Sequence, residues 1–419
     1  MVDNTCVRCN YCKTRIRLRF QMGYFDIPFD ICCPECGVHI SGVRRIIDES
    51  SIELHNANLI VCPLDDVDYY ADFSVELPHS KIKKFVSQDE IIKNGFSPFM
   101  MTMQLFKDDI YFQLTQKMGN TLSFRDDMWP RISALYDLLF SRKIELVKEP
   151  LHSISERFVV KNELDAMMAL HQTCVMGFNN MLPDGTLQEF IDLSKIIYRD
   201  DVMHQLGSLI DILGKKEYFE FTSKRLIKIY TRWLSDFEKY MPATMLELGN
   251  AKDSFDREKY GIATTSFENV MSFYADSYEL ILDMIDIAVL LNNVTVRGDY
   301  NKFSPRANVK DFSGYSKQAK SERVKSMLEN EPFGKVIPLN RNIRNAIAHY
   351  TYDFDSSSQK ITFVDKYKNK ESKVETYLID LAMLCYENMR ILIYLDELMY
   401  SLQKWDYIRA GMKPNIKAR

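Results

Sequence analysis

Two closely spaced cysteine pairs near the start of the chain limit how its first segment can fold. The first pair is Cys9 and Cys12, and the second pair, Cys33 and Cys36, follows after twenty residues. Pairs at this spacing can bring four thiolates to one tetrahedral metal ion, and zinc is the usual ion of such sites. Four thiolates leave no open position for a substrate, so we expect a structural zinc ion.

The residues around the pairs indicate how the chain reaches the ion. Gly37 directly follows the second pair and tolerates a tight turn that folds backbone amides toward the sulfurs. The stretch "KTRIRLRF", residues 13–20, follows the first pair and shows the two-residue period of a strand. This pattern resembles the zinc-ribbon family, in which a β-hairpin joins two such turns. Cys6 and Cys32 stay open as alternative ligands, because Cys6 forms a CxxC pair with Cys9 and Cys32 adjoins Cys33.

Three arginines share one face of the strand predicted for residues 13–20. Arg15, Arg17 and Arg19 alternate with apolar residues, so their side chains should point the same way. One interpretation is an ordinary solvated strand face. The other is a nucleic-acid contact surface, in which the guanidinium groups meet phosphates.

The hydrophobic periodicity predicts a mainly α protein with three consecutive parts. A β-rich zinc-ribbon segment should cover residues 1–98, and a central helical domain should cover 99–259. The third part, residues 260–410, should be a helical bundle. Within it, residues 360–378 predict a β-hairpin with a charged tip, and a long helix should close the bundle over 378–404.

Charge and hydropathy indicate which partners and which cellular location we expect for the chain. The net charge of −4 offers no overall basic field, so a nucleic-acid site must be local. The first twenty residues carry cysteines and arginines instead of an apolar run, and no stretch has the roughly 20 apolar residues that a membrane span needs. We therefore expect a cytoplasmic protein without a membrane anchor.

The stretch "LNRNIRNAIAHYTYDF", residues 339–354, places arginines, asparagines and a histidine on a predicted helix at about 338–349. Histidine titrates near neutral pH and can take a proton from a ribose hydroxyl or give one to a leaving oxygen. Arginine stays charged and can hold a phosphate in a forked hydrogen bond. Together these groups suit the cleavage of RNA, whose 2′-hydroxyl can attack the neighbouring phosphate.

Arg344, Asn345 and His349 form the pattern R-N-x-x-x-H. This pattern, between two long helices over about 260–405, resembles the HEPN superfamily, with the β-hairpin as an insertion. The resemblance implies a metal-independent endoribonuclease that leaves 2′,3′-cyclic phosphates, with His349 as general acid and base, Arg344 as phosphate clamp and Asn345 orienting the imidazole. It also implies a homodimer and a role as a regulated toxin or an anti-phage defence effector, as in abortive infection.

Helix geometry complicates this site. Residues 344 and 349 lie about 140° apart around an ideal helix, so a straight helix would not aim both at one phosphate. The helix could fray near His349, the long side chain of Arg344 could wrap around it, or two copies could combine their motifs; we expect the third, aided by the first. Arg341 is an alternative clamp, about 80° from His349.

A second hypothesis belongs to another functional class. Each polar residue of the pattern also has an ordinary structural interpretation, with His349 in the core, Arg344 on the surface and Asn345 at a helix end. The chain would then be a non-catalytic HEPN-like dimerising scaffold, with the zinc ribbon as a nucleic-acid- or protein-binding module.

Overall fold

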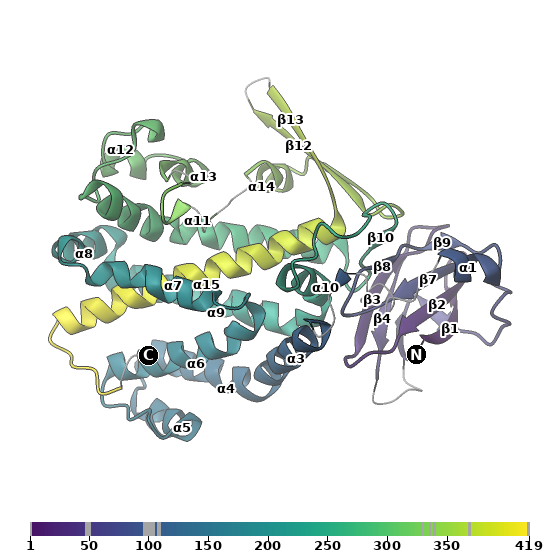
Figure 1. Ribbon diagram of the computed structural model, residues 1–419, viewed down its shortest axis with the longest axis horizontal. Helices are drawn as coiled ribbons and strands as arrows, with labels where there is room; N and C mark the ends of the chain where they lie inside the picture. The colour runs from purple at the N-terminus through teal and green to yellow at the C-terminus, as the bar shows by residue number, and fades with distance from the viewer. Residues whose placement is uncertain are drawn as a thin grey trace. The chain divides into compact units, whose positions relative to one another are not determined.

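The computed structural model describes residues 2–46, 52–94, 105–106, 110–327, 330–334, 337, 341–367 and 370–416 (Figure 1). The described part is mostly helical with a β-rich N-terminal segment, which confirms the predicted mainly α class at this level. Two compact units share the chain. Unit 1 consists of Met1–Gly119, Asp236–Ala275 and Asn342–Glu387, and unit 2 consists of Asn120–Ser235, Asp276–Arg341 and Asn388–Arg419. Of the predicted domain boundaries, the one at 98/99 lies outside the described residues and the one at 259/260 stays a prediction.

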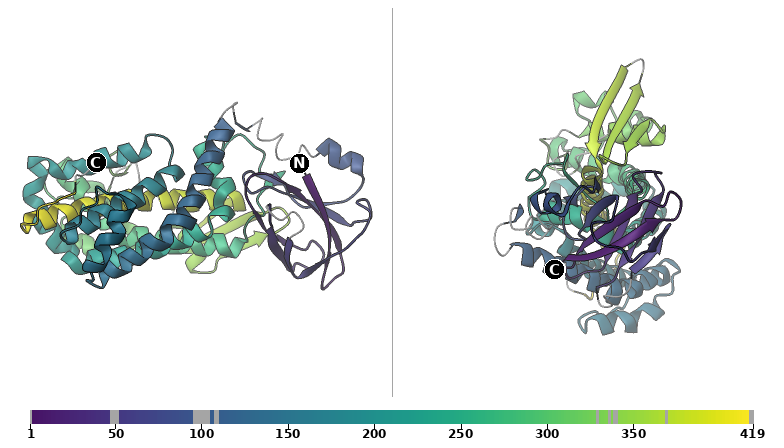
Figure 2. Two further views of the ribbon diagram at one scale, coloured as in Figure 1. Left: turned by 90° about the horizontal axis from the view of Figure 1, so that it is seen from below. Right: turned by 90° about the vertical axis from the view of Figure 1, so that its right-hand side faces the viewer.

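The N-terminal strands of unit 1 form two sheets, which Figure 2 shows from two further directions. The strands are β1 Val2–Cys9, β2 Arg15–Gln21, β3 Ile27–Cys32, β4 His39–Arg44, β5 Ile52–His55, β6 Ala57–Leu59, β7 Tyr69–Phe73 and β9 Lys83–Lys84. One sheet has the order β6-β1-β2-β7-β9, in which only the β2–β7 pair is parallel. The other is antiparallel, with the order β3-β4-β5.

Three phenylalanines join these sheets. Phe20 of β2 and Phe73 of β7 stack with ring centroids 4.9 Å apart, and each lies 5.4 Å from the ring of Phe29 on β3. All three side chains are at most 2% exposed. The strand predicted from "KTRIRLRF" is thereby confirmed, since its apolar positions fill the space between the two sheets.

The remaining elements of unit 1 come from all three of its stretches. They are α1 Gln88–Asn94, α10 Phe237–Leu248, α14 Arg341–Ala348, β8 His79–Ser80, β10 Tyr260–Gly261, β11 Tyr352–Asp355, β12 Lys360–Tyr367 and β13 Lys370–Tyr377. The predicted β-hairpin is confirmed as β12–β13, and β11 adds a third strand beside β12. Residues 338–340 of the predicted motif helix lie outside the described residues.

The regular elements in the described part of unit 2 are all helices. Its helices are α4 Trp129–Phe140, α5 Glu145–Ile154, α6 Glu163–Phe178, α7 Thr186–Ser194, α8 Asp200–Leu213, α9 Lys215–Ser235, α12 Phe312–Ser316 and α13 Lys320–Arg323. Three further helices belong partly to each unit, namely α3 Ile110–Ser123, α11 Phe267–Arg297 and α15 Leu378–Arg409. Among the described helices, none combines the length and the apolar character that crossing a membrane requires.

The long helices α11 and α15 pack against each other in both units. In unit 1 the Cys385 thiol donates a hydrogen bond to the Val270 carbonyl at 3.4 Å, and in unit 2 Asn388 donates to Ser277 Oγ at 3.0 Å. Helix α15 is buried around most of its circumference, with Ile391 through Leu395 all at most 4% exposed. A helix segment that is buried on all sides needs apolar residues on all sides, which explains the unbroken apolar run at 391–395.

Candidate functional site

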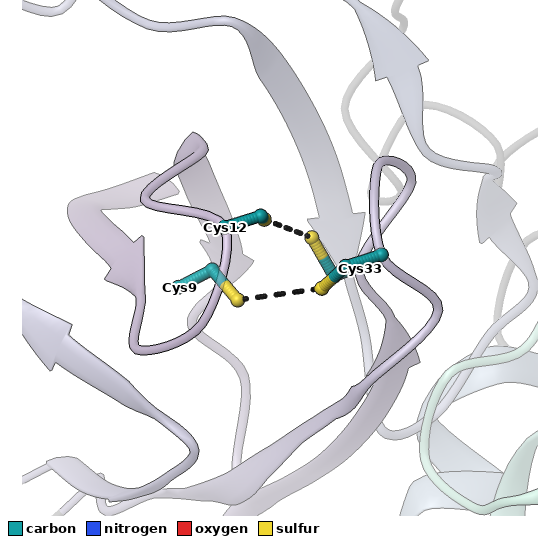
Figure 3. A group of neighbouring side chains, drawn as sticks. Cys9, Cys12 and Cys33 are labelled. Carbon is teal, nitrogen blue, oxygen red and sulfur yellow. Dashed lines mark hydrogen bonds between the residues drawn. The ribbon is translucent and has the colours of Figure 1, made fainter.

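Each cysteine pair lies at the tip of its own β-hairpin. Cys9 ends β1 and Cys12 lies in the turn to β2, while Cys33 follows β3 (Figure 3). Cys36 lies in the turn to β4. The predicted single hairpin between the pairs is therefore wrong. Strand β2 pairs with β1 and β7, whereas β3 pairs with β4, so the chain between the two cysteine pairs crosses from one sheet to the other.

The four sulfurs of Cys9, Cys12, Cys33 and Cys36 lie within 4.8 Å of one another. The Sγ atoms are 3.7 Å apart between Cys9 and Cys36, and 3.4 Å apart between Cys12 and Cys33. Four sulfurs placed about 2.3 Å from a central zinc ion would be about 3.8 Å apart in a regular tetrahedron. The predicted ligands thus form a cluster that could hold one metal ion.

The two turns repeat the same backbone geometry. The amide of Cys9 donates to the Thr14 carbonyl at 2.9 Å, and the amide of Cys33 donates to the Val38 carbonyl at 2.8 Å. The residue after each pair has a left-handed conformation, with φ of +68° at Lys13 and +72° at Gly37. The expected role of Gly37 in a tight turn is confirmed, and Lys13 adopts the same conformation despite its side chain.

Backbone amides turn toward the sulfurs, as the sequence predicted. The Cys33 sulfur accepts from the amides of Glu35 and Cys36, and the Cys36 sulfur accepts from the amide of Val38. Burial of Cys12 opposes ionisation, but hydrogen bonds from Thr14 and the neighbouring thiols outweigh it and lower its pKa to about 6. Burial and the neighbouring thiols raise the pKa of Cys33 to about 12, and a bound cation would lower it.

The two alternative ligands have partners elsewhere. The Cys6 thiol is hydrogen-bonded to Cys62, and burial together with this neighbour raises its pKa to about 11. The Cys32 sulfur lies 3.8 Å from His39 Nε2, and the other ring nitrogen of His39 lies 2.8 Å from Asp30 Oδ1. Cys6 and Cys32 therefore lie outside the four-cysteine cluster.

The arginine face of β2 does not form an exposed basic surface. Arg17 is 6% exposed, donates to Asn4 Oδ1 at 2.9 Å and contacts the Leu64 carbonyl. Arg19 forms an ion pair with the buried Asp72 at 2.8 Å, and Arg15 forms one with Asp66 at 2.6 Å. The structure contradicts the predicted nucleic-acid contact at Arg17 and Arg19, whose side chains are covered on this central strand. At Arg15, whose side chain is 37% exposed, the contact stays a prediction.

The R-N-x-x-x-H pattern lies on α14 and the turn that follows it. Arg344 and Asn345 are half-buried within the helix, whereas His349 lies one residue beyond its end and is exposed. The helix therefore ends just before His349, where fraying was one of the expected outcomes. The interpretation of His349 as a core histidine is excluded by this exposure.

A chain of hydrogen bonds fixes the polar side chains of α14. Arg344 Nη1 donates to Asn345 Oδ1 at 3.3 Å, and Asn345 Nδ2 donates to Asp365 Oδ2 of β12 at 3.2 Å. Asn342 also reaches the hairpin, where its amide donates to Ser372 Oγ at 3.2 Å. Side chains of the β12–β13 hairpin thus hold α14 in place. The position of the hairpin in the sequence did not predict this contact.

A buried polar cluster in unit 2 joins side chains that no motif in the sequence connects. His171 Nε2 lies 2.8 Å from Glu397 Oε2 and Nδ1 lies 4.0 Å from Asp396 Oδ2, while its ring stacks on Tyr400 at 3.7 Å. Burial raises the pKa of Asp396 to about 6. Burial lowers the pKa of His171, but the two carboxylates outweigh it and raise the pKa overall. In the sequence, only the adjacent acids Asp396 and Glu397 within an apolar helical pattern indicated this buried cluster.

Comparison with known proteins identifies no relative. No protein-family model, curated protein or solved structure matches the chain. The resemblance to zinc ribbons and to the HEPN superfamily therefore rests on the sequence patterns alone.

Proposed function

We propose that the chain is a metal-independent endoribonuclease of the HEPN type, with His349 and Arg344 as its catalytic residues. One observation carries the proposal: His349 is exposed directly after the helix that holds Arg344. An imidazole that handles protons of a bound substrate must be accessible, and here it is. The guanidinium of Arg344 is half-buried and fixed by Asn345, which suits a clamp that holds a phosphate in one orientation.

In this proposal His349 removes the proton from a ribose 2′-hydroxyl, and the freed oxygen attacks the adjacent phosphorus. Arg344 stabilises the negative charge that grows on the phosphate oxygens. The bond to the 5′-oxygen breaks, and this oxygen receives the proton that His349 took up, leaving a 2′,3′-cyclic phosphate on one fragment and a 5′-hydroxyl on the other. The contacts of Asn345 favour a role in positioning Arg344 rather than in orienting the imidazole.

The active form is a homodimer in this account. The resemblance to the HEPN superfamily implies a shared cleft between two copies, in which an arginine of one copy meets the histidine of the other. Mixing His349→Ala with Arg344→Ala chains then restores one intact site per mixed dimer. Two inactive parents that stay inactive after subunit exchange would argue for a site within a single chain.

The four-cysteine cluster holds a structural zinc ion in the same account. Because four thiolates complete the coordination, the ion supplies stability rather than chemistry. The resemblance to the HEPN superfamily also implies a role as a regulated toxin or anti-phage effector, active in the cytoplasm.

The test is incubation of the purified chain with single-stranded RNA in excess EDTA. Cleavage should be lost in His349→Ala and in Arg344→Ala, and retained in two matched controls at exposed sites, His204→Ala and Arg199→Ala. Growth of cells that express the same variants reveals an activity that needs a cellular trigger. RNA binding without cleavage or toxicity, unchanged in His349→Ala, would establish the scaffold instead.

A further inference from the structure

Tyr350 is the residue next to His349, and its ring is largely free in solvent. It is 83% exposed, more than any other aromatic side chain whose exposure the structure describes. Scattered exposed aromatics are common on protein surfaces, so exposure alone has no functional meaning. The backbone of Tyr350 supplies the second observation.

Tyr350 has a left-handed backbone with φ of +54°. It occupies the position after a helix end at which glycine is usual, because the amide of Tyr350 donates to the Ile347 carbonyl at 3.2 Å and the next amide, of Thr351, donates to the Ala346 carbonyl at 2.9 Å. A bulky side chain is disfavoured in this conformation. The chain thus carries an exposed tyrosine where glycine would be more stable.

The turn that carries Tyr350 is held on both sides. Before it, the amide of His349 donates to the Asn345 carbonyl at 3.0 Å. After it, the Thr351 hydroxyl and carbonyl both bond to Val364 of β12, at 2.5 Å and 2.8 Å. A residue in an unfavourable conformation persists only where its surroundings fix it, and such residues gather at functional sites. The ring is therefore presented from a turn that is fixed on both sides, one residue after the exposed His349.

We propose that Tyr350 is a base-stacking residue that binds the nucleobase beside the phosphate gripped by His349 and Arg344. This inference rests on the proposed ribonuclease function and names its substrate as single-stranded RNA with an unstacked base. Proteins hold the bases of single strands on aromatic faces, and stacking accepts any base because each has a flat π-surface. The arrangement thus predicts positioning of the cut link with little sequence selectivity.

The variant Tyr350→Gly gives an unusually sharp test, because it removes the ring while it relieves the backbone. It should unfold at a higher temperature than the parent chain, yet bind RNA about ten- to 100-fold more weakly. Tyr350→Phe should keep the affinity, and Tyr24→Ala, which removes another exposed ring, should keep it as well. Binding is measured by fluorescence anisotropy of a labelled single-stranded RNA of mixed sequence, with all variants in a His349→Ala background to prevent cleavage.

The salt dependence of the RNA affinity distinguishes a stacking contact from a charged contact. Loss of a stacking contact should weaken binding equally at every salt concentration and leave the slope of log Kd against log salt unchanged. In the active background the same substitution should raise KM more than it lowers kcat.

Three results would overturn the inference. The first is wild-type affinity and KM in Tyr350→Gly while the parent chain cuts RNA, which leaves the proposed ribonuclease intact. The second is conversion of a dimer to monomers by Tyr350→Gly in light scattering, which assigns the ring to an interface between copies. The third is a parent chain that neither binds nor cuts RNA, in which case the proposed function fails together with the inference.

Discussion

The side-chain amide of Asn345 on α14 donates a hydrogen bond to Asp365 Oδ2 on β12, at 3.2 Å. Asn345 in turn accepts a hydrogen bond from Arg344, so the guanidinium is tied to the hairpin through two bonds in series. An insertion between the motif and the closing helix thereby supports the residue that we propose as the phosphate clamp. Support of this kind sets the accuracy with which a catalytic group is held.

The substitution Asp365→Ala should lower the rate of RNA cleavage about fivefold, because it removes one hydrogen bond worth about 1 kcal/mol from this series. The stability of the chain should change little, since Asp365 is only partly buried. Cleavage rates and thermal unfolding are measured side by side. Asp353→Ala, an exposed carboxylate on the neighbouring strand β11, is the control and should cut like the parent. Equal rates for both variants would show that Asn345 holds Arg344 without help from the hairpin.

The four-cysteine cluster leads to a prediction about zinc content, for which Cys6 and Cys32 provide controls. Elemental analysis of the purified chain should find about one zinc ion per molecule. Cys33→Ser should lose the ion and unfold at a lower temperature, because the metal stabilises the two hairpin tips together. Cys32→Ser and Cys6→Ser should retain it, since both thiols have partners outside the cluster. Loss of zinc from Cys32→Ser but not from Cys33→Ser would contradict the assignment of Cys33 as a zinc ligand.

Much of this cluster could be predicted from the sequence, because CxxC spacing and the following glycine impose local geometry. The arrangement of strands could not. "KTRIRLRF" has the alternation of a half-exposed strand, but its partners β1 and β7 and the segment that covers Arg17 come from elsewhere in the chain. The periodicity of a strand predicts which residues share a face, but it does not predict which other segments cover that face.

The same limit applies to the candidate active site. The end of α14 near His349 was among the expected outcomes, and the β12–β13 hairpin was read from its alternating residues. The bond from Asn345 to Asp365 joins residues twenty positions apart through a sheet register that no local pattern specifies. The buried cluster of His171 likewise requires the pairing of α6 with α15, which are more than two hundred residues apart.

The two cysteine turns share one backbone geometry, so adding a side chain at Gly37 and removing the one at Lys13 should change stability in opposite directions. Gly37→Ala should reduce the free energy of unfolding by about 1 kcal/mol, because an L-residue is disfavoured at φ of +72°. No atom lies within 4 Å of the position that the new methyl group would take, so steric clash does not contribute. Lys13→Gly should stabilise the other turn by a fraction of this amount. Chemical unfolding with zinc in excess measures both, and equal destabilisation by the two variants would refute the shared geometry.

The buried acid Asp396 predicts a pH dependence of stability in unit 2. Its pKa is about 6 in the folded chain, above the value of about 4 in the unfolded chain, so the folded state holds a proton that the unfolded state has lost between these values. The contribution to stability is therefore fully present below about pH 4 and is lost as the pH rises through about 6. The raised pKa of His171 acts in the same direction.

Asp396→Asn cannot ionise and should therefore gain stability relative to the parent as the pH rises from about 4 to about 7, by at most about 3 kcal/mol. Urea unfolding at a series of pH values measures the difference. Asp353→Asn, at an exposed carboxylate, should follow the parent at every pH. A constant difference between Asp396→Asn and the parent across this range would show that Asp396 ionises normally in the folded chain.

The chemistry of the RNA ends tests the central claim most directly. RNA cut by the wild-type chain in EDTA should carry 2′,3′-cyclic phosphate and 5′-hydroxyl ends, identified by mass spectrometry, and His349→Ala should produce neither. Ends with 3′-hydroxyl and 5′-phosphate groups, or the same cyclic ends from His349→Ala, would contradict the assignment of His349 and Arg344 as the residues that cleave RNA.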